Sequence, residues 1–505
     1  MVDSEREFYS PEDVVECFRS NVLQNGTPDL AGIEEEIGLV DSNGKPLSHN
    51  SFQAVLRDLI KALPGGEVIP GTSVCGDRID VLQGSFLYGN VQPETNTTLV
   101  EYAHAPTDQS WGIFAQSKAF TQVLDEVAGS KGLQVIGCGV VPTLCWDDFL
   151  KNDVVIPNKS FIYSWTHMSQ GTRPEYCRTV FGTASVHHNM GFNDPELMAN
   201  YITTTLRMQP SMIALLGNSP LWDHQPHAVG GESLLSCRSF WQIDYGKIFC
   251  QKDGVSYLYP DFLIDPSADF SAIVNGYLDL PLDRTIIGGN KVFCNGLTMK
   301  KYLQGYEIAG KTYFPDEAAL GMMVREPIVD VRPSFLGVGP RVEARAHDGV
   351  SQPVAVAIDA FYRGILENLD EAQDVTSGMT NQEIRHARLE VCKRGMAAPV
   401  RHENGCIKTQ KDLMTIFLEI AKEGLSRRGF EEEVLLAPLS VLAETGMNPA
   451  ERLLSVYKVG DTPQKLLDLM AYKKFSFSDG VGYPWPTEEP STFQRSFGGL
   501  LSCSR

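Results

Sequence analysis

The chain has 505 residues, of which 43% are hydrophobic and 21% are charged, a composition typical of a globular protein with a large core. Its 43 basic and 63 acidic residues give a net charge of −20, and lysine and arginine form no run that could follow a phosphate backbone. No apolar stretch reaches the roughly 18 residues that cross a bilayer. We therefore expect neither nucleic acid nor a membrane as a partner.

The N-terminal residues and the cysteines bear on where the protein works. The sequence MVDSEREFYSPEDVV is acidic, lacks the apolar core of a secretory signal and is not arginine-rich like a transit peptide. The 11 cysteines show no CxxC spacing, which favours reduced thiols over a disulfide framework or a zinc site. We therefore expect a cytoplasmic protein.

The expected elements mix helices and strands from the start of the chain. Ser10 followed by Pro11 predicts a helix start, and residues 32–40 predict a strand that ends in a turn at 41–44. Residues 50–63 then predict a helix. Further strands are expected at 85–92, 96–106, 133–141, 183–192 and 340–348, and long helices at 111–128, 195–216 and 353–368. Antiparallel strands with intervening helices indicate the α+β class.

The sequence beyond about residue 380 predicts mainly helices. Thr409 begins a helix that ends near Gly429, and Asn448 begins another. The last residues are rich in Ser, Gly, Phe and Pro and predict an irregular tail. We expect a mixed region over 1–380, a helical region packed on it over 381–475 and a tail over 476–505.

Three consecutive acids interrupt the strand expected at 32–40. Desolvating each carboxylate costs several kcal/mol unless something compensates. Because successive side chains of a strand point to opposite faces, Glu34 and Glu36 share one face at a separation of roughly 7 Å. That spacing suits a divalent-metal site. Glu35 lies on the face of Ile33 and Ile37, and we expect it at an exposed end of the strand.

Two other expected strands also carry polar groups on faces that should be buried. Glu101 stands on the otherwise apolar face of residues 99–103 and needs a cation. In 183–192, alternation puts His187 beside Ser185 and Asn189, whereas His188 points to the core. Taken by itself, His187 is more typical of a core histidine with its hydrogen bonds satisfied than of a metal ligand. For Glu101, a structural role and a functional role are about equally expected.

The last strand carries a carboxylate beside a guanidinium. Alternation puts Glu343, Arg345 and His347 on one face. This pair taken alone is typical of an ordinary ion pair, but beside a metal it would suit a phosphate. Because four separate strand segments bring an acid or an imidazole to a face that should be buried, we favour one shared site.

Residues 305–312, GYEIAGKT, match the P-loop pattern GxxxxGK[ST]. A working P-loop has a buried strand before it and a helix directly after it, so that backbone N–H groups hold phosphates. Here an amphipathic helix is expected before the motif, and Pro315 interrupts any helix that begins at Lys311. We therefore reject the motif as a nucleotide site.

Read in order, the motifs resemble those of the glutamate-cysteine ligase family, in particular its plant-type branch. GIEEEIGLV and TLVEYAHAP look like the family's metal-binding strands, SVHHN resembles its V-H-x-N strand, and RVEARAHD is similar to its L-E-x-R-x-x-D strand. GNSPLW, LSCRSFWQIDYGKIF, LTMKKYLQG and the closing helices also match, so the resemblance covers about residues 25–470. It implies a catalytic region similar to glutamine synthetase over 1–380.

The resemblance implies specific roles for site residues and specific substrates. Five residues would hold two or three Mg²⁺ ions that carry ATP: Glu34, Glu36, Glu101, His187 and Glu343. Arg345 and Arg238 would be catalytic, meeting phosphate and developing negative charge, and Asn189 and Arg332 would hold substrate. The implied reaction joins the γ-carboxylate of glutamate to the amine of cysteine through an acyl phosphate.

The chemistry independently requires such a set. A carboxylate reacts with an amine at neutral pH only after it acquires a leaving group, so ATP must phosphorylate it. Two unit charges at about 4 Å repel by roughly 4 kcal/mol at an effective dielectric near 20, and divalent cations held by carboxylates on rigid strands offset this repulsion.

Two alternatives remain open from the sequence. Residues 166–181 and 321–326 depart from the family pattern, so a related carboxylate-amine ligase with another acceptor or donor is one alternative. The other is a metal-free binding or regulatory protein that keeps only the fold, although retention of the expected acidic positions argues against it.

Overall fold

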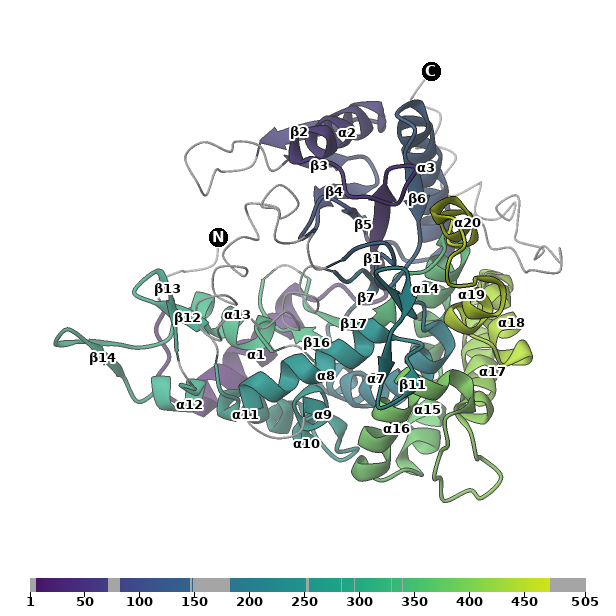
Figure 1. Ribbon diagram of the computed structural model, residues 1–505. Helices are drawn as coiled ribbons and strands as arrows, with labels where there is room; N and C mark the ends of the chain where they lie inside the picture. Colours follow the sequence, from purple (N-terminus) through teal and green to yellow (C-terminus); the bar gives the residue numbers. More distant parts are fainter. Residues whose placement is uncertain are drawn as a thin grey trace.

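The computed structural model describes residues 6–70, 82–145, 148, 182–250, 254–282, 284–294, 296–327, 329–337 and 339–472. A large antiparallel sheet lies at its centre (Figure 1). The strands follow in the spatial order β16 (Val331–Ser334), β17 (Arg341–Asp348), β7 (Ser185–Gly191), β1 (Ala31–Val40), β5 (Leu99–His104), β4 (Gly89–Pro93), β3 (Leu82–Phe86) and β2 (Glu67–Pro70). Strand β6 (Gln134–Ile136) pairs with the C-terminal end of β1. The predicted α+β class is confirmed.

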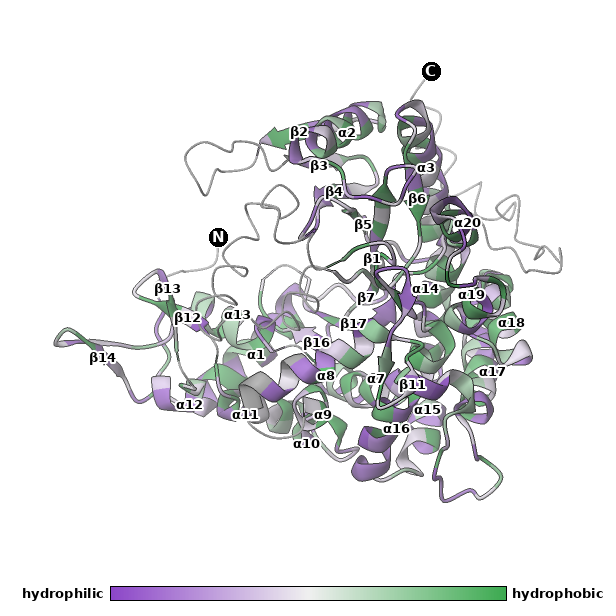
Figure 2. Ribbon diagram, in the orientation of Figure 1, coloured by the Kyte–Doolittle hydropathy of each residue, from purple (hydrophilic) through white to green (hydrophobic). Residues whose placement is uncertain are grey.

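Three long helices pack against the sheet: α3 (Ser110–Ser130), α7 (Pro195–Leu216) and α14 (Gln352–Glu367). Helix α14 is buried around its whole circumference from Pro353 to Ile365, as expected for a helix that is apolar on nearly every side. Figure 2 shows hydrophobic residues gathered where the central helices meet the sheet, whereas α16 (Asn381–Arg394) is largely hydrophilic.

Smaller elements complete the described part of the chain. The other helices are α1 (Pro11–Asn25), α2 (His49–Ala62), α8 (Cys237–Cys250), α9 (Gly254–Leu258), α10 (Asp261–Ile264), α11 (Phe270–Asp279), α12 (Met299–Tyr302), α13 (Glu317–Arg325), α15 (Leu369–Ser377), α17 (Gln410–Arg428), α18 (Ala437–Thr445), α19 (Pro449–Val456) and α20 (Pro463–Leu469), with short 3-10 turns η2 (Gly395–Ala397) and η3 (Glu432–Leu436). Small hairpins are β8–β9 (221–226), β10–β11 (228–233), β12–β13 (284–293) and β14–β15 (306–313). Across these residues we find no helix whose length and apolar character would let it span a bilayer.

Helices α14 and α17 cross with their backbones in contact. A Cβ atom on Gly364 would lie 2.1 Å from the carbonyl oxygen of Ala421, and one on Gly424 would lie 2.1 Å from the carbonyl oxygen of Gly364. Real Cβ atoms do not approach this closely, so only glycine permits the crossing. The C-terminal helices are thereby joined directly to the helix that lies under the sheet.

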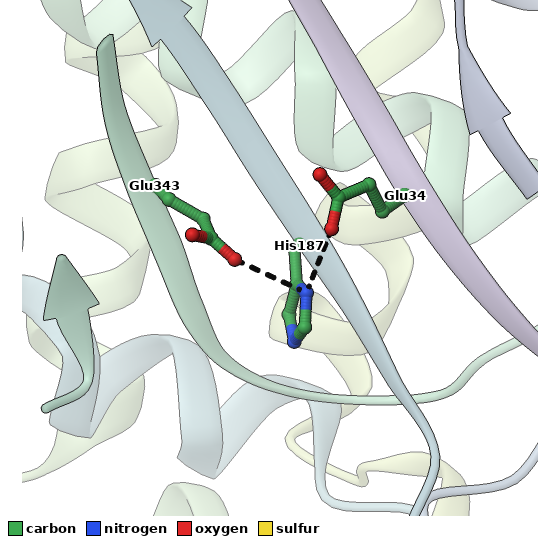
Figure 3. A group of neighbouring side chains, drawn as sticks. All are labelled: Glu34, His187 and Glu343. Carbon is green, nitrogen blue, oxygen red and sulfur yellow. Dashed lines mark hydrogen bonds and ion pairs between the residues drawn. The ribbon is translucent and has the colours of Figure 1, made fainter. Parts of the chain in front are cut away.

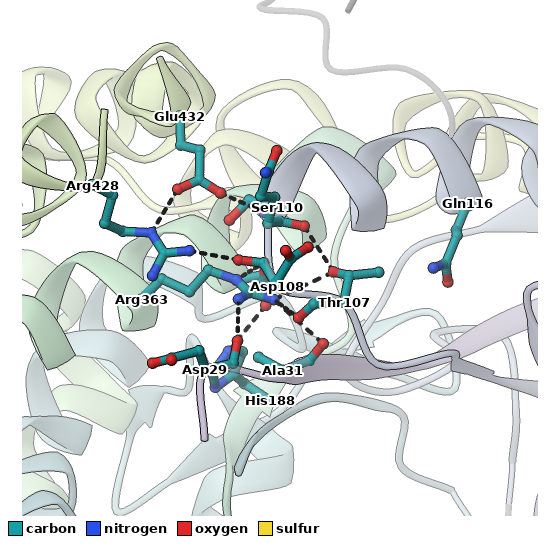
Figure 4. A network of polar contacts seen from close by, with 12 residues as sticks. Asp29, Ala31, Thr107, Asp108, Ser110, Gln116, His188, Arg363, Arg428 and Glu432 are labelled. Carbon is teal, nitrogen blue, oxygen red and sulfur yellow. Dashed lines mark hydrogen bonds and ion pairs between the residues drawn. The ribbon is translucent and has the colours of Figure 1, made fainter. Parts of the chain in front are cut away.

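Two arginines, the buried Arg363 and the half-buried Arg428, also tie the helices to the loop after β5 (Figure 4). On α14, Arg363 donates to the carbonyl oxygens of Asp29, at 3.1 Å, and Thr107, at 2.8 Å. On α17, Arg428 donates to the carbonyl oxygen of Asp108 at 2.6 Å. These bonds satisfy carbonyls at the entry of β1 and the exit of β5, and so fix the ends of two strands that carry acids.

Several predicted elements are confirmed and others are wrong in detail. Helix α1 begins after Ser10, whose Oγ accepts from the Asp13 N–H as predicted for a cap. The single strand expected at 85–92 is instead the hairpin β3–β4, because Gly89 takes φ of 138° and reverses the chain. Of residues 133–141 only β6 pairs with β1, since beyond it Gly137 and Gly139 donate to other segments.

The rejection of the P-loop is confirmed. Residues 306–308 and 311–313 form the hairpin β14–β15. Ala309 and Gly310, with φ of 51° and 79°, occupy its tip, as in a tight primed turn. The next helix, α13, begins only at Glu317, so this motif lacks the helix N-terminus that would hold a phosphate.

Candidate active site

Strand register brings the predicted polar residues to one face of the sheet. Residues directly opposite each other on antiparallel strands point to the same side. The paired residues are Glu34 with His187, Glu36 with Glu101, Asn189 with Glu343, and Glu343 with Arg332. All five residues predicted to hold metal therefore share this face, together with the two predicted to hold substrate.

Three of these side chains meet closely (Figure 3). His187 Nδ1 lies 3.2 Å from Glu34 Oε2 and 3.3 Å from Glu343 Oε1. One ligand atom from each residue lies within 4.8 Å of the other two. Two carboxylates and an imidazole at this spacing can converge on one divalent cation, so the residues present fit a metal ion. His187 is buried, but its partners are acids of the site rather than core groups.

Ser185 connects this group to Glu36. Its Oγ lies 2.8 Å from Glu36 Oε2 and 2.7 Å from His187 Nε2. A hydroxyl has one hydrogen, and an ionised carboxylate can only accept. With Glu36 ionised, Ser185 donates to Glu36 and accepts from Nε2–H, which leaves the Nδ1 lone pair facing Glu34 and Glu343. Alternation places Ser185 on this face, but no role was predicted for it.

A second acidic group consists of Glu36, Glu101 and the nearby Glu94. Burial raises the pKa of the Glu101 carboxyl well above its ordinary value, and the charges of Glu94 and Glu34 raise it further. Burial likewise raises the pKa of Glu36, and Glu94 adds to this while His187 opposes it. Ionised carboxylates disfavoured by burial and by one another are the groups that a bound cation stabilises.

Glu94 was missed because it precedes β5 instead of lying on it. Its N–H donates to the carbonyl oxygen of Leu99 across a turn of buried polar residues. Strand alternation therefore gives no signal at this position. The sequence signal that could have found it is an acid immediately before the buried stretch Thr95–Thr98, close to Glu101.

Two arginines contact Glu343. Arg332 donates to Glu343 Oε2 from Nη2 at 2.7 Å and from Nε at 3.0 Å, and Arg345 Nη1 lies 3.2 Å from Oε1. Although burial opposes ionisation, these two guanidinium groups hold the pKa of the Glu343 carboxyl well below its ordinary value. Glu343 is thus a permanent anion beside two cations that can also meet a phosphate.

Arg238 approaches the site from the start of α8. It is buried, and its Nη2 donates to the carbonyl oxygen of Arg345 at 2.8 Å. Its Nη1 has no hydrogen-bond partner among the described residues. Burial lowers the pKa of Arg238, and the charges of Asp348 and Glu36 oppose this effect. A buried guanidinium with a free N–H beside the acidic face can donate a hydrogen bond to an oxyanion.

Asn189 joins the acidic face to a cavity at the edge of the sheet. Its Nδ2 donates to Glu34 Oε1 at 3.1 Å, and its Oδ1 accepts from Arg341 Nε at 2.9 Å. The cavity has a volume of about 500 Å³. Its lining includes Arg325, Arg332, Arg341, Glu343, Phe18 and Phe335. Arg341 was not predicted as a site residue, although alternation puts it on the same face as Glu343 and Arg345.

Two expectations about strand faces are wrong. His347 does not share the face of Glu343, because a one-residue bulge after Ala344 shifts the register and turns His347 toward α14, where its Nε2 contacts the Tyr362 hydroxyl at 2.7 Å. Glu35 is not at an exposed end, since only 1% of it is accessible. The core position predicted for His188 is confirmed. Residues 166–181 lie outside the described residues.

An antiparallel sheet that gathers carboxylates, an imidazole and arginines on one face suits an ATP-dependent carboxylate-amine ligase. The model of glutamate-cysteine ligase family 2 matches residues 30–466. The chain belongs to this family, as the order of its motifs predicted.

Curated relatives and a solved structure agree with this assignment. The chain is similar to a chloroplastic glutamate-cysteine ligase of Brassica juncea, with 29% identity over 88% of this chain and 80% of the relative. Its similarity to chloroplastic glutamate-cysteine ligase A of Oryza sativa subsp. indica is 28% over 88% of this chain and 84% of the relative. The crystal structure of glutamate-cysteine ligase from Francisella tularensis in complex with AMP shares the fold, with a TM-score of 0.52, 11% identity and coverage of 94% and 92%.

The expected cytoplasmic location is wrong by the same comparison. The plant relatives, including that of Medicago truncatula, are named as chloroplastic proteins. The composition of the N-terminal residues and the cysteine spacing were therefore an insufficient basis for that prediction.

Proposed function

We propose that this protein is an ATP-dependent ligase that joins the γ-carboxylate of glutamate to the amine of cysteine through an acyl phosphate. The observation that carries the proposal is the convergence of Glu34, His187 and Glu343 on a single point, beside two arginines. Family membership supplies the reaction class, and the acidic face supplies the means to bring a nucleotide polyanion to a carboxylate.

The acidic face holds two groups of metal-binding residues in this proposal. Glu34, His187 and Glu343 form one group, and Glu36 and Glu101, with Glu94 beside them, form the other. Mg²⁺ bound there would neutralise the ATP phosphates and the substrate carboxylate and align them for transfer. We propose that two or three ions bind, and that the rigid strands hold the metal ligands in fixed positions during the reaction.

The arginines act on the phosphoryl group. Arg345 and Arg332 are already charged partners of Glu343, so a γ-phosphate beside that residue meets their guanidinium groups. Arg238, with its free Nη1, stabilises the negative charge that develops when the amine attacks the acyl phosphate and phosphate departs. Asn189 orients the substrate through the amide that already links Glu34 with Arg341.

The cavity beside β16 and β17 is proposed to hold the nucleoside of ATP. Its size of about 500 Å³ falls within the range of small-ligand pockets. Phe18 and Phe335 offer apolar walls for a flat base, whereas Arg332 and Glu343 place its inner end at the phosphates. Glutamate, which is charged at both ends, is better matched by the polar face of the sheet.

We also propose the division of the chain into a catalytic region over 1–380 and a helical region over 381–475. The close crossing of α14 and α17 supports a helical region that is packed on the catalytic one rather than tethered to it. The proposed tail over 476–505 lies beyond the described residues.

The direct test supplies ATP, Mg²⁺ and glutamate and measures phosphate release before and after cysteine is added. We expect cysteine to stimulate release and γ-glutamylcysteine to appear by mass spectrometry. Glu36→Ala should abolish turnover, whereas Lys311→Ala, in the rejected P-loop motif, should leave it unchanged. The proposal would be contradicted if cysteine does not change the rate of phosphate release, or if Lys311→Ala abolishes release while Glu36→Ala does not.

A second candidate is a related ligase with another amine acceptor, in which the cavity holds the acceptor instead of the nucleoside. The observation that favours it is that Gly321, Met322, Val324 and Arg325, in a stretch that departs from the family pattern, line the cavity. The same assay with a panel of amines separates the two, because turnover restricted to cysteine would exclude the second candidate.

A further inference from the structure

The last described residues of the chain pair with β6, and the side chain of Tyr472 lies on the face of the sheet opposite the acidic one. After α20, the carbonyl oxygen of Met470 accepts from the Gly137 N–H at 2.9 Å, and Tyr472 N–H donates to the carbonyl oxygen of Val135 at 3.0 Å. The carbonyl of Tyr472 in turn accepts from the Gln352 N–H, at the start of α14, at 2.9 Å. The backbone of Tyr472 is thereby fixed between β6 and α14. This residue lies beyond residue 466, where the family match ends.

The side chain of Tyr472 reaches Glu35 on β1. Its hydroxyl donates to Glu35 Oε2. Glu35 Oε1 accepts from His104 Nε2 at 2.7 Å and from Ser117 Oγ at 3.2 Å. Glu35 and Tyr472 are only 1% and 2% exposed. The Glu35 carboxylate is therefore shielded from water and accepts hydrogen bonds from three protein donors instead. These donors come from β5, α3 and the C-terminal segment.

The position of Glu35 in the strand connects this hydrogen-bond network to the acidic face. Glu35 stands between Glu34 and Glu36 and points to the opposite face, so a rotation of β1 about its axis would displace all three together. Its back-face neighbours Ile33 and Ile37 are buried in apolar clusters, where packing is non-directional. The backbone of β1 is paired on both sides, with β5 and with β7. The directional hydrogen bonds of Glu35 add a side-chain restraint on the strand at the point between Glu34 and Glu36.

We propose that Tyr472 is a positioning residue, which acts through Glu35 to hold Glu34 and Glu36 in the geometry that binds divalent cations. The inference rests on the proposed function of the acidic face. It assigns a role in that site to a residue behind the sheet, whose side chain contacts no residue of the acidic face itself.

The test replaces only the hydroxyl. Tyr472→Phe keeps the ring in its place, and Mn²⁺ binding measured by electron paramagnetic resonance on the full chain reports on the site without turnover. Loss of a residue that hydrogen-bonds a metal ligand typically lowers metal affinity 10- to 100-fold. Because Tyr472 contacts Glu35 and not a metal ligand, we expect a smaller loss of Mn²⁺ affinity, about 5-fold. The KM for ATP in the presence of Mg²⁺ should rise in parallel. Tyr457→Phe is the matched control, because Tyr457 is a buried C-terminal tyrosine whose hydroxyl faces the carbonyl of His224 instead.

A double-mutant cycle shows whether Tyr472 acts through Glu35. If it does, Glu35→Gln combined with Tyr472→Phe weakens Mn²⁺ binding no more than the stronger single variant does. Additive losses, or a lowered melting temperature with unchanged Mn²⁺ affinity, would show that Tyr472 is merely structural. A wild-type chain that binds no Mn²⁺ would remove the proposed metal site and this role together, whereas equal binding by wild type and Tyr472→Phe would remove only the role.

Discussion

Glu34 on β1 and His187 on β7 are direct cross-strand partners, and Glu34 Oε2 lies 3.2 Å from His187 Nδ1. The same nitrogen lies 3.3 Å from Glu343 on β17, so the imidazole stands between carboxylates from two other strands (Figure 3). The arrangement depends on register, because a slip of one residue would turn each side chain to the other face. The site is thus a property of the pairing of three strands.

Removal of the Ser185 hydroxyl should weaken metal binding. Without it, Nε2 of His187 loses the acceptor that fixes its tautomer, and Glu36 loses a donor. We expect Ser185→Ala to lower Mn²⁺ affinity by about 10-fold, as for other outer partners of metal ligands. Ser185→Thr keeps the hydroxyl and should retain most of the affinity. Titration calorimetry measures both, and equal loss in the two variants would speak against a role for the hydroxyl.

The stability of the metal-free protein should fall as pH rises. The pKa of the Glu101 carboxyl is raised well above its ordinary value of 4.5, by burial first and then by Glu94. The folded state therefore keeps a proton that the unfolded chain has released, and stability declines from pH 4.5 upward through the raised pKa. Glu101→Gln removes this loss and should be more stable than the wild type at pH 8 without metal, although we expect it to be inactive.

Scanning calorimetry in EDTA and in Mg²⁺ checks this prediction. Because Mg²⁺ binds the ionised carboxylates, it should stabilise the wild type more at pH 8 than at pH 5. It should stabilise Glu101→Gln less, since that variant keeps only the group formed by Glu34, His187 and Glu343. Glu419→Gln, at an exposed position on α17, serves as the control. If the wild type melts at a higher temperature than Glu101→Gln at pH 8 in EDTA, then repulsion between Glu101 and its neighbouring carboxylates does not destabilise the metal-free protein.

Arg238→Lys should reduce catalysis without affecting metal binding. Lysine keeps the charge but lacks the fork that donates to the Arg345 carbonyl and presents a second N–H. We expect kcat to fall by about 100-fold, the scale of a lost oxyanion donor, with Mn²⁺ affinity unchanged. Arg385→Lys is the control, because Arg385 contacts Tyr259 and Asp261 at the surface. A fall in Mn²⁺ affinity equal to the fall in kcat would assign Arg238 to metal binding instead.

Gly364→Ala should destabilise the fold. The added Cβ would lie 2.1 Å from the carbonyl oxygen of Ala421, so α14 and α17 must move apart. We expect a loss of about 3 kcal/mol in the free energy of unfolding, as for overpacked cores. Gly129→Ala, where a Cβ meets nothing within 4 Å, should instead stabilise helix α3 by about 0.5 kcal/mol. Urea unfolding followed by circular dichroism measures both, and similar effects in the two variants would be inconsistent with the close crossing.

Local rules predicted the elements whose signals are local. The cap at Ser10, the strand predicted at 32–40 and the acids on alternate positions follow from neighbouring residues. The family, the fold class and the ligase activity followed from the order of motifs along the chain, and the comparisons confirm them.

Features set by distant partners could not be predicted. The bulge that turns His347 away from the site exists only in the pairing of β17 with β7. Glu35 is buried because a tyrosine 437 residues further along the chain reaches it. Glu94 lies in a turn, where alternation is silent. The roles of the individual site residues stay predictions until they are tested on the protein.

The most direct test of the central claim is the location of bound metal. Crystals grown with Mn²⁺ and a non-hydrolysable ATP analogue would be examined by anomalous scattering at the manganese edge. We predict a peak within coordination distance of Glu34 Oε2, His187 Nδ1 and Glu343 Oε1, and a second beside Glu36 and Glu101. Nucleotide bound with manganese elsewhere, or with none on this face of the sheet, would contradict the account.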